Sequence, residues 1–115
     1  RVTGLVKYLS DQNTNIIISA NITSQKFRIW CKKNIKNYFE IFIDTPFNIL
    51  LKRDYKNLYR KAFKKKIKNV VGFDIPFKKP KNPSLIIDNS GTVNKLKLNY
   101  FLVIRKLKKE KIKIF

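Results

Sequence analysis

The side chains that perform most protein chemistry are scarce in these 115 residues. There is no histidine, and Cys31 is the only cysteine. A zinc site built from cysteine and histidine, and a catalytic triad that uses histidine, are therefore excluded within one chain. Cys31 lies in an apolar run that we expect to be helical, and we interpret it as a small buried thiol rather than a nucleophile.

Three polar residues lie at the ends of expected elements. Asp44 follows an apolar strand, Arg53 ends the helix after it, and Thr92 follows the last expected strand. Each has a structural alternative. Asp44 could lie beside the ligands of a metal ion, but we favour a helix-start charge. Arg53 and Thr92 could cap helices. The three glycines are scattered, so a phosphate-binding loop of the form Gly-x-x-x-x-Gly-Lys-Ser/Thr is absent.

The elements that would position these residues alternate along the chain. Continuous apolar runs predict three strands buried on both faces, as in a parallel sheet covered by helices. We expect them at residues 16–20, 38–43 and 84–88. Helical periodicity is seen at residues 2–9, 24–34, about 46–53, 57–66 and 93–110. In the second helix, Ser24 is the expected cap, and Phe27, Trp30 and Cys31 should face inward. The alternation predicts an α/β protein with a parallel sheet.

The net charge of +20 would by itself suggest a nucleic-acid partner. The excess is lysine (22) far more than arginine (5), and it accompanies 12 asparagines and 16 isoleucines. These three inflated residue types share A/T-rich codons, and lysine is the solubilising cation, whereas base and phosphate recognition favours arginine. We therefore interpret the charge mainly as a solvated surface.

No run of the sequence reaches the roughly 18 uninterrupted apolar residues of a membrane span. The first residues lack the charged-then-apolar pattern of a secretory signal, so we expect a cytoplasmic protein. Because the chain contains no methionine, it could be a piece of something longer.

The stretch from Phe39 to Asp88 resembles the adenylylsulfate kinases. These kinases carry a strand ending in an acidic-Thr/Ala-Pro turn, a helix ending in Arg-Asp, and then a lid with a fixed order of motifs. The matching residues here, in order, are Ile43-Asp44-Thr45-Pro46, Arg53-Asp54, Lys56 to Ala62, Ile67 to Asp74, Pro76-Phe77, Pro80, Asn82-Pro83 and Leu85 to Asp88. Order and spacing hold without a gap. A weaker match covers residues 16–26, and Arg1 would fall near the end of an arginine-rich substrate segment.

The resemblance implies a partial sheet of the phosphate-loop kinase type, made of three parallel strands with flanking helices and a basic lid at about residues 53–83. It also implies transfer of the γ-phosphoryl group of ATP to the 3′-hydroxyl of adenosine 5′-phosphosulfate, with magnesium bridging the phosphates. The family's phosphate loop and catalytic acid would precede Arg1. Residues 1–115 would thus be the carboxy-terminal part of such a domain, with no catalytic or metal-binding residue of its own identified.

The resemblance also assigns candidate binding residues. Those that would contact adenylylsulfate are Ile22, Thr23, Lys56, Asn69 and Val70. A cation at Lys56 suits a sulfate–phosphate anhydride, although a solvated lysine is the alternative.

On the ATP side, Arg53 and Thr92 would lie near the nucleotide. This pair comes from the start of the lid and from the loop after the third strand.

Several residues depart from the family pattern. Val70 occupies the place of a phenylalanine that stacks on the substrate adenine, and such a stack contributes roughly 1–3 kcal/mol. Phe73 would replace it only if the lid backbone shifts. A lid acid is Lys66 here, and the lid glycine is Asn57. These departures suggest either drift after loss of function or a kinase with another nucleotide substrate.

The resemblance places a missing strand between the first two strands expected here. Those strands would have to pair directly or expose apolar edges, so we expect the chain to be poorly stable alone and to form a homodimer or associate with the missing half. The alternatives are a degenerate nucleotide-binding relative and a small basic nucleic-acid-binding protein. The second is disfavoured because the aromatic residues follow core patterns instead of alternating with arginine.

Overall fold

The structure is a computed structural model that describes residues 2–112, so Arg1 lies outside the described residues. Its centre is a pair of parallel strands, β1 (Ile41–Asp44) and β2 (Leu85–Asp88). Their register places Ile41 opposite Leu85 and Asp44 opposite Asp88. Both strands are rich in β-branched residues, which suit a pleated surface. Their carboxyl ends lie at the same edge, where ligands of open α/β sheets bind.

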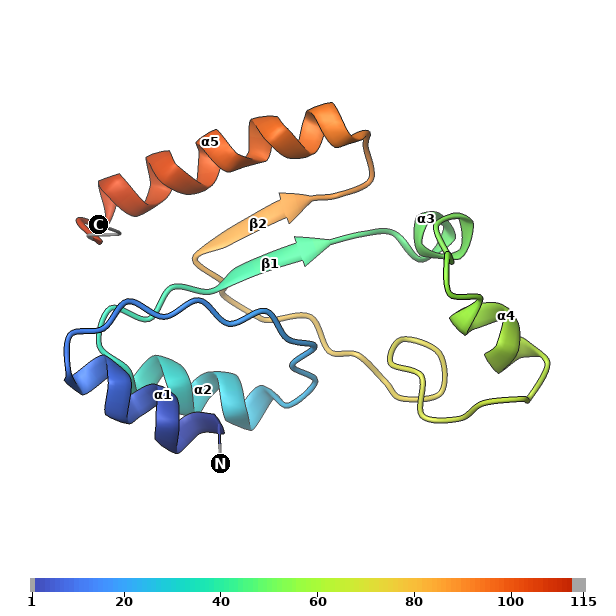
Figure 1. Ribbon diagram of the computed structural model, residues 1–115, viewed down its shortest axis with the longest axis horizontal. Helices are drawn as coiled ribbons and strands as arrows, with labels where there is room; N and C mark the ends of the chain where they lie inside the picture. Colours follow the sequence, from blue (N-terminus) through green and yellow to red (C-terminus); the bar gives the residue numbers. More distant parts are fainter. Residues whose placement is uncertain (1, 113–115) are drawn as a thin grey trace.

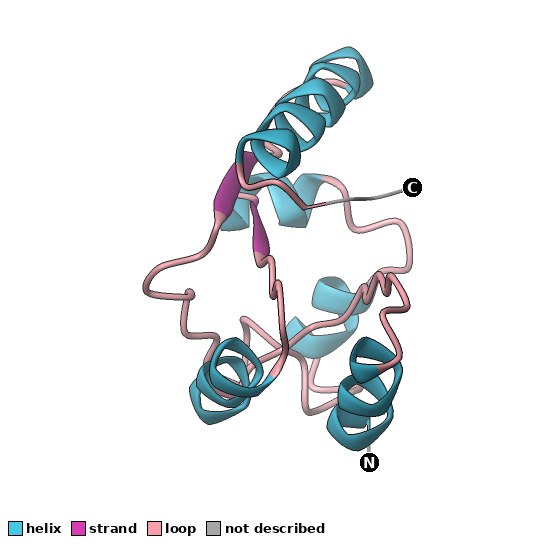
Figure 2. Cartoon of the chain, turned by 90° about the vertical axis from the view of Figure 1, so that its left-hand side faces the viewer, coloured by secondary structure: helices cyan, strands magenta, loops and turns pink. Residues whose placement is uncertain are grey.

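Helices lie on both sides of this pair. Helix α5 (Val93–Lys109) lies beside β2, while α1 (Val2–Asp11) and α2 (Gln25–Asn34) lie on the other side of the strands (Figure 1 and Figure 2). The expected capping of α2 is confirmed, because the Ser24 hydroxyl accepts a hydrogen bond from the Phe27 N–H at 3.2 Å. Helix α5 begins and ends almost where its periodicity predicts.

The connection between the strands consists of helix α3 (Phe47–Lys52) and residues 53–83, the stretch that the resemblance predicts to be a lid and that is called the lid segment below. It contains helix α4 (Leu58–Phe63), shorter than expected, and extends beyond the carboxyl ends of the strands before it returns to β2. Helix α3 begins at Phe47, one residue later than its expected start at about residue 46, and Pro46 is its cap residue.

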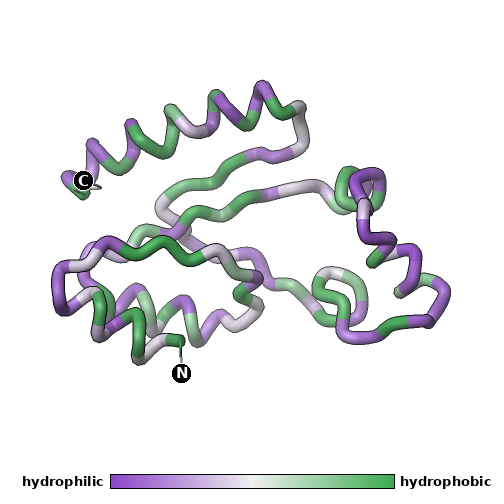
Figure 3. Tube along the Cα trace, in the orientation of Figure 1, coloured by the Kyte–Doolittle hydropathy of each residue, from purple (hydrophilic) through white to green (hydrophobic). Residues whose placement is uncertain are grey.

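The first of the three expected strands, at residues 16–20, does not form in the part of the chain that the structure describes. Residues 16–20 are extended coil, with Ile17 93% exposed and Ile18 47% exposed. Figure 3 colours this run as strongly hydrophobic, so its composition suits a buried strand. A strand exists only through hydrogen bonds to a neighbouring strand. Within the described residues the sheet has two strands, β1 and β2, and neither is paired with residues 16–20.

Little of the apolar surface is covered. The buried apolar residues among those described are Cys31, Ala62, Val70 and Ile87, and no large side chain there is less than 2% exposed. The radius of gyration is 16.3 Å, against about 13 Å for a compact domain of this length. Trp30, expected to face inward, is 38% exposed. Among residues 2–112, no further layer of structure covers the outer edges of the two strands or the exposed apolar faces of the helices.

In the part of the chain that the structure describes, no helix is both long enough and apolar enough to cross a membrane.

Candidate functional site

The loop before α2 carries the first two candidate residues, Ile22 and Thr23, both half-buried. Its conformation is held by Arg28, whose side chain is 6% exposed. The Arg28 Nη1 donates to the Ile22 carbonyl, and Nη2 donates to Gln25 Oε1 at 2.9 Å and to the Lys78 carbonyl at 2.7 Å. The guanidinium group therefore links this loop to the returning end of the lid.

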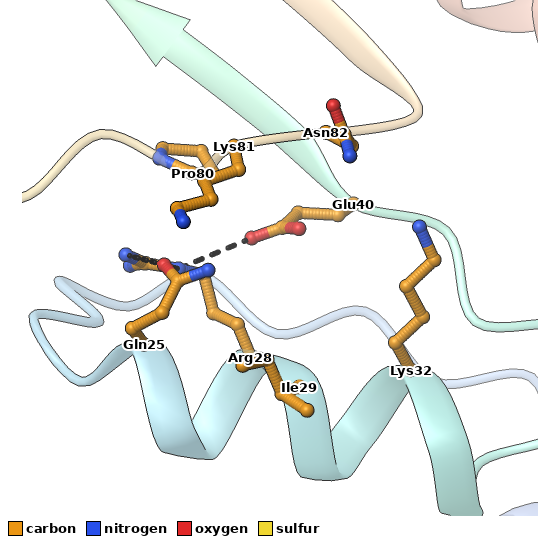
Figure 4. A pocket seen from close by; sticks show the side chains of 8 residues that line it. All are labelled: Gln25, Arg28, Ile29, Lys32, Glu40, Pro80, Lys81 and Asn82. Carbon is orange, nitrogen blue, oxygen red and sulfur yellow. Dashed lines mark hydrogen bonds and ion pairs between the residues drawn. The ribbon is translucent and has the colours of Figure 1, made fainter.

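A small cavity of about 210 Å³ lies beside this guanidinium, lined by residues of α2, by Glu40 and by residues 80–82 (Figure 4). Arg28 Nε lies 3.8 Å from Glu40 Oε1. Burial raises the pKa of Glu40 above its ordinary value, and the positive charges of Arg28 and Lys32 offset only part of this rise. Burial, with a smaller contribution from Glu40, also raises the pKa of Tyr38 to about 12.

Cys31 faces the same region and is 4% exposed. Burial and then the charge of Glu40 raise the pKa of its thiol. A buried thiol with a raised pKa is a poor nucleophile, which confirms the interpretation of Cys31 as a packed side chain.

The second pair of candidates, Arg53 and Thr92, comes together at the carboxyl ends of the strands. Arg53 donates to the carbonyls of Asn89 (2.7 Å) and Gly91 (2.5 Å), in the loop between β2 and α5. These residues and Thr92 line an open cleft of about 500 Å³ with Tyr55, Val93 and Leu96. Thr92 is the N-cap residue of α5, as expected, but its side chain makes no capping bond. The start of the lid is thus tied to the loop after β2.

Asp44 was expected to be a charge at a helix start, but it is the last residue of β1, and α3 begins only at Phe47, after the cap residue Pro46. The Asp44 Oδ2 forms an ion pair with Lys79 Nζ at 2.6 Å, in the returning end of the lid. The Lys79 ammonium also lies 5.8 Å from the centre of the Phe42 ring, on which Phe77 stacks with ring centroids 6.0 Å apart. Both ends of the lid are therefore fixed to the strand region.

The lid itself presents the remaining candidates. Lys56 is exposed, and it precedes Asn57, whose φ of 52° explains why glycine is an alternative at this position. The Asp54 carboxylate accepts the N–H groups of Leu58 at 2.7 Å and Arg60 at 3.0 Å, so it holds the start of α4.

A turn further along the lid contains Asn69 and Val70. The Asp74 carboxylate accepts both of their backbone N–H groups, at 2.7 Å for Asn69. Val70 is 4% exposed. Phe73 packs edge-on against Phe63 with centroids 4.8 Å apart and remains 41% exposed. The small apolar side chain of Val70 thus occupies the turn, and the partly exposed ring of Phe73 lies in the same turn.

Only some of the candidates are brought together. Arg53 and Thr92 share one cleft, and Ile22 joins the lid through Arg28 at Lys78 instead of at Lys56, Asn69 or Val70. Sequence reasoning missed Arg28. The sequence does contain one indication that Arg28 is buried: it lies three residues before the buried Cys31 and therefore on the same face of an amphipathic helix.

The described residues contain no group of three acidic, histidine or cysteine side chains able to hold a metal ion, so they provide no magnesium site of that kind. Asp44 and Asp88 are opposite each other in the sheet, but each carboxylate is engaged by a lysine, Lys79 and Lys95, at 2.6 Å.

Comparisons with known proteins give a consistent picture. The sequence model of the adenylylsulphate kinase family matches residues 1–88. The cytidine diphosphoramidate kinase of Campylobacter jejuni is 41% identical over 101 residues, which are 88% of this chain and 58% of that protein. A probable adenylyl-sulfate kinase of Pyrococcus abyssi is 30% identical over 104 residues, 90% of this chain and 59% of the relative.

Among solved structures, the APS kinase CysC of Mycobacterium tuberculosis, in complex with AMPPNP and APS, superposes with a TM-score of 0.76. It is 28% identical, and the match covers 94% of this chain and 63% of that one. The chain therefore spans about three-fifths of the length of these relatives.

Proposed function

Because this chain belongs to the adenylylsulfate kinase family, we propose that it is the lid-bearing part of a kinase that transfers the γ-phosphoryl group of ATP to a hydroxyl group of a second nucleotide. The first candidate substrate is adenosine 5′-phosphosulfate, phosphorylated at its 3′-hydroxyl. The observation that carries the proposal is the family match over residues 1–88, which includes the whole lid segment. The structural neighbour bound to AMPPNP and APS supports it.

In this proposal the cleft at Arg53 and Thr92 takes part of the ATP. Arg53 is committed to the carbonyls of Asn89 and Gly91, so its contribution is to hold the lid and the loop after β2 in one geometry. Phosphoryl transfer depends mainly on positioning and charge neutralisation. A fixed cleft wall is therefore a direct contribution to the reaction.

The acceptor nucleotide is proposed to lie between the loop of Ile22 and Thr23 and the lid residues Lys56, Asn69 and Val70. Lys56 is exposed and offers a cation to an anionic anhydride. Magnesium would be held outside the described residues, since these supply no cluster of acidic ligands.

Cytidine diphosphoramidate is the second candidate substrate. It is supported by the 41% identity to a kinase of that name, compared with 30% for the Pyrococcus adenylyl-sulfate kinase. It is also supported by Val70, a 4% exposed aliphatic side chain where an adenine-stacking phenylalanine would stand. A site that does not stack the base with an aromatic ring loses part of its preference for adenine.

The test measures phosphoryl transfer from radiolabelled ATP by the full-length gene product, with adenylylsulfate and with cytidine diphosphoramidate. Phosphorylation of either nucleotide supports the proposed kinase, and the larger kcat/KM identifies the substrate. Absence of transfer to both, by a protein that is folded by circular dichroism, would overturn the proposal.

A substitution separates the two substrates further. Val70→Phe should raise kcat/KM for adenylylsulfate relative to the cytidine compound by roughly 5- to 150-fold if base stacking is restored, since that stack contributes about 1–3 kcal/mol. The matched control is Val71→Phe, which adds the same ring one residue away. Equal effects of the two variants would contradict the assignment of Val70 to the base.

We further propose that the exposed apolar side chains of the strands, Ile41, Ile43 and Ile86, are covered in the working enzyme by protein surface that these 115 residues do not supply. Further sequence of the same protein, or a second copy, would do so. Reversible, cooperative unfolding of these residues alone, well above room temperature, would contradict this.

A further inference from the structure

The side chain of Arg28 joins two segments that are remote in the sequence and that the proposed function brings to the same substrate. One is the loop of Ile22 and Thr23, and the other is the returning end of the lid at residues 77–80. The bond from Arg28 to the Lys78 carbonyl spans 50 residues of sequence. The Arg28 side chain is 6% exposed, so this link is shielded from water.

All three guanidinium nitrogens are engaged. Nη1 binds the Ile22 carbonyl, Nη2 binds the Lys78 carbonyl and Gln25, and Nε binds Gln25 at 3.3 Å and faces Glu40. A planar fork with several fixed donors is required for this pattern, because a lysine ammonium is a single point of charge and cannot reach all of these acceptors. The arrangement is visible in Figure 4, where the Arg28 head lies between α2 and the segment of residues 80–82.

The neighbours of Lys78 strengthen the link. Phe77 stacks on Phe42, and Lys79 pairs with Asp44, so the side chains on either side of the Lys78 carbonyl are fixed to β1. The returning end of the lid is thus held to β1 by two side chains and to the substrate loop by one guanidinium. Only the last of these contacts connects the lid to Ile22.

We propose that Arg28 is a positioning residue that couples the lid to the loop of Ile22 and Thr23, so that seating of the acceptor nucleotide and closure of the lid reinforce each other. The coupling to the nucleotide rests on the proposed function, whereas the link itself does not. Glu40 balances the buried positive charge, and Arg28 does not contact the reacting groups.

The link is tested first without any nucleotide, by limited trypsin digestion of the full-length gene product. Trypsin must extend the backbone at the bond it cuts, and the Lys78–Lys79 bond includes the carbonyl that Arg28 holds. The next bond, between Lys79 and Pro80, resists trypsin because proline follows the lysine. Cleavage at this site is therefore confined to the Lys78–Lys79 bond, and mass spectrometry of the peptides measures its rate. Arg28→Lys and Arg28→Met should each raise the initial rate about tenfold, which corresponds to about 1.4 kcal/mol.

Two further variants keep this test decisive. Lys32→Met is the matched control, because Lys32 lines the same cavity and also lowers the pKa of Glu40 but makes no recorded bond to either carbonyl. Its cleavage rate should stay within about twofold of the wild type. If Arg28→Met does not fold, the double variant Arg28→Met/Glu40→Gln removes the uncompensated carboxylate and restores folding, but cleavage stays fast. Wild-type cleavage rates in both the double variant and Arg28→Lys would overturn the proposal.

The coupling is tested next with saturating adenylylsulfate or cytidine diphosphoramidate as the probe. In the wild type the nucleotide should slow cleavage at Lys78–Lys79, and in Arg28→Lys this protection should fall about tenfold. The variant's KM for the acceptor should rise about tenfold while the KM for ATP stays within about twofold. Unchanged protection with a fall in kcat alone would overturn the coupling. Absence of protection and turnover in the wild type would count against the proposed function, while the nucleotide-free digestion still decides on the link.

Discussion

Substitution of Arg53 tests whether the lid is fixed to the loop after β2 by its guanidinium group. Arg53 makes two hydrogen bonds to backbone carbonyls, at 2.7 Å to Asn89 and 2.5 Å to Gly91. A hydrogen bond with a charged partner contributes about 1.5–3 kcal/mol. The side chain is only half-buried and the cleft is open, so water can replace part of what is lost. We therefore expect Arg53→Met to lower the free energy of unfolding by about 1.5–3 kcal/mol, and Arg53→Lys by about half of that.

The assay is urea unfolding of the full-length gene product, with the slope of the transition compared between variants to confirm that the same surface is exposed. Lys52→Met is the matched control, since Lys52 is the exposed neighbour in the last turn of α3 and shares any effect of removing a cation from a helix end. That effect alone is about 0.3–1 kcal/mol. A loss for Arg53→Met no larger than for Lys52→Met would refute the reasoning and leave Arg53 as a helix-capping cation.

Substitutions at three other residues test local features. Asn57→Gly should leave stability nearly unchanged and Asn57→Val should lower it by about 1–2 kcal/mol, because φ at this position is 52°; equal urea midpoints would contradict the left-handed conformation. Lys95 and the Ser90 hydroxyl and N–H hold the pKa of Asp88 well below its usual range. The stability from this group is present above the ordinary carboxyl pKa of about 4 and is lost as the pH falls through the folded value. Asp88→Asn should therefore flatten the acid side of the stability curve, and identical curves would refute this. In an ultraviolet titration, Tyr38 should ionise near a pKa of about 12, about two units above an exposed tyrosine; loss of this late phase in Tyr38→Phe is the check.

Periodicity predicted best the elements that pack or pair with another element of this chain. Strands β1 and β2 pair as two apolar runs, and α5 keeps its apolar stripe along most of its length. Residues 16–20 are rich in isoleucine, as β1 is, but they form no strand, because a strand needs a hydrogen-bonded neighbour as well as an apolar sequence. Composition alone could not reveal whether a partner strand is adjacent.

Some features of the candidate site were likewise predicted and others were not. The resemblance predicts that Arg53 and Thr92 both lie near the nucleotide, and the structure places the two residues in one cleft. The role of Arg28 could not be predicted, because its acceptors are backbone carbonyls that any residue could supply and one of them is 50 residues away. The ion pair of Asp44 with Lys79 was missed for the same reason, since residues in a loop as long as the lid segment have no pairing register.

The lid segment also sets the order in which the sheet can form during synthesis. Strand β1 ends at Asp44 and its partner begins at Leu85, so the ribosome adds about forty residues between them. At roughly 5–20 residues per second this takes about 2–8 s. During this interval β1 lacks its partner β2, and the delay is far longer than the microseconds in which an adjacent hairpin closes. Pairing of β1 with β2 therefore waits until the lid segment has been synthesised. The yield of folded protein should respond when synonymous codons change the translation speed of the lid segment.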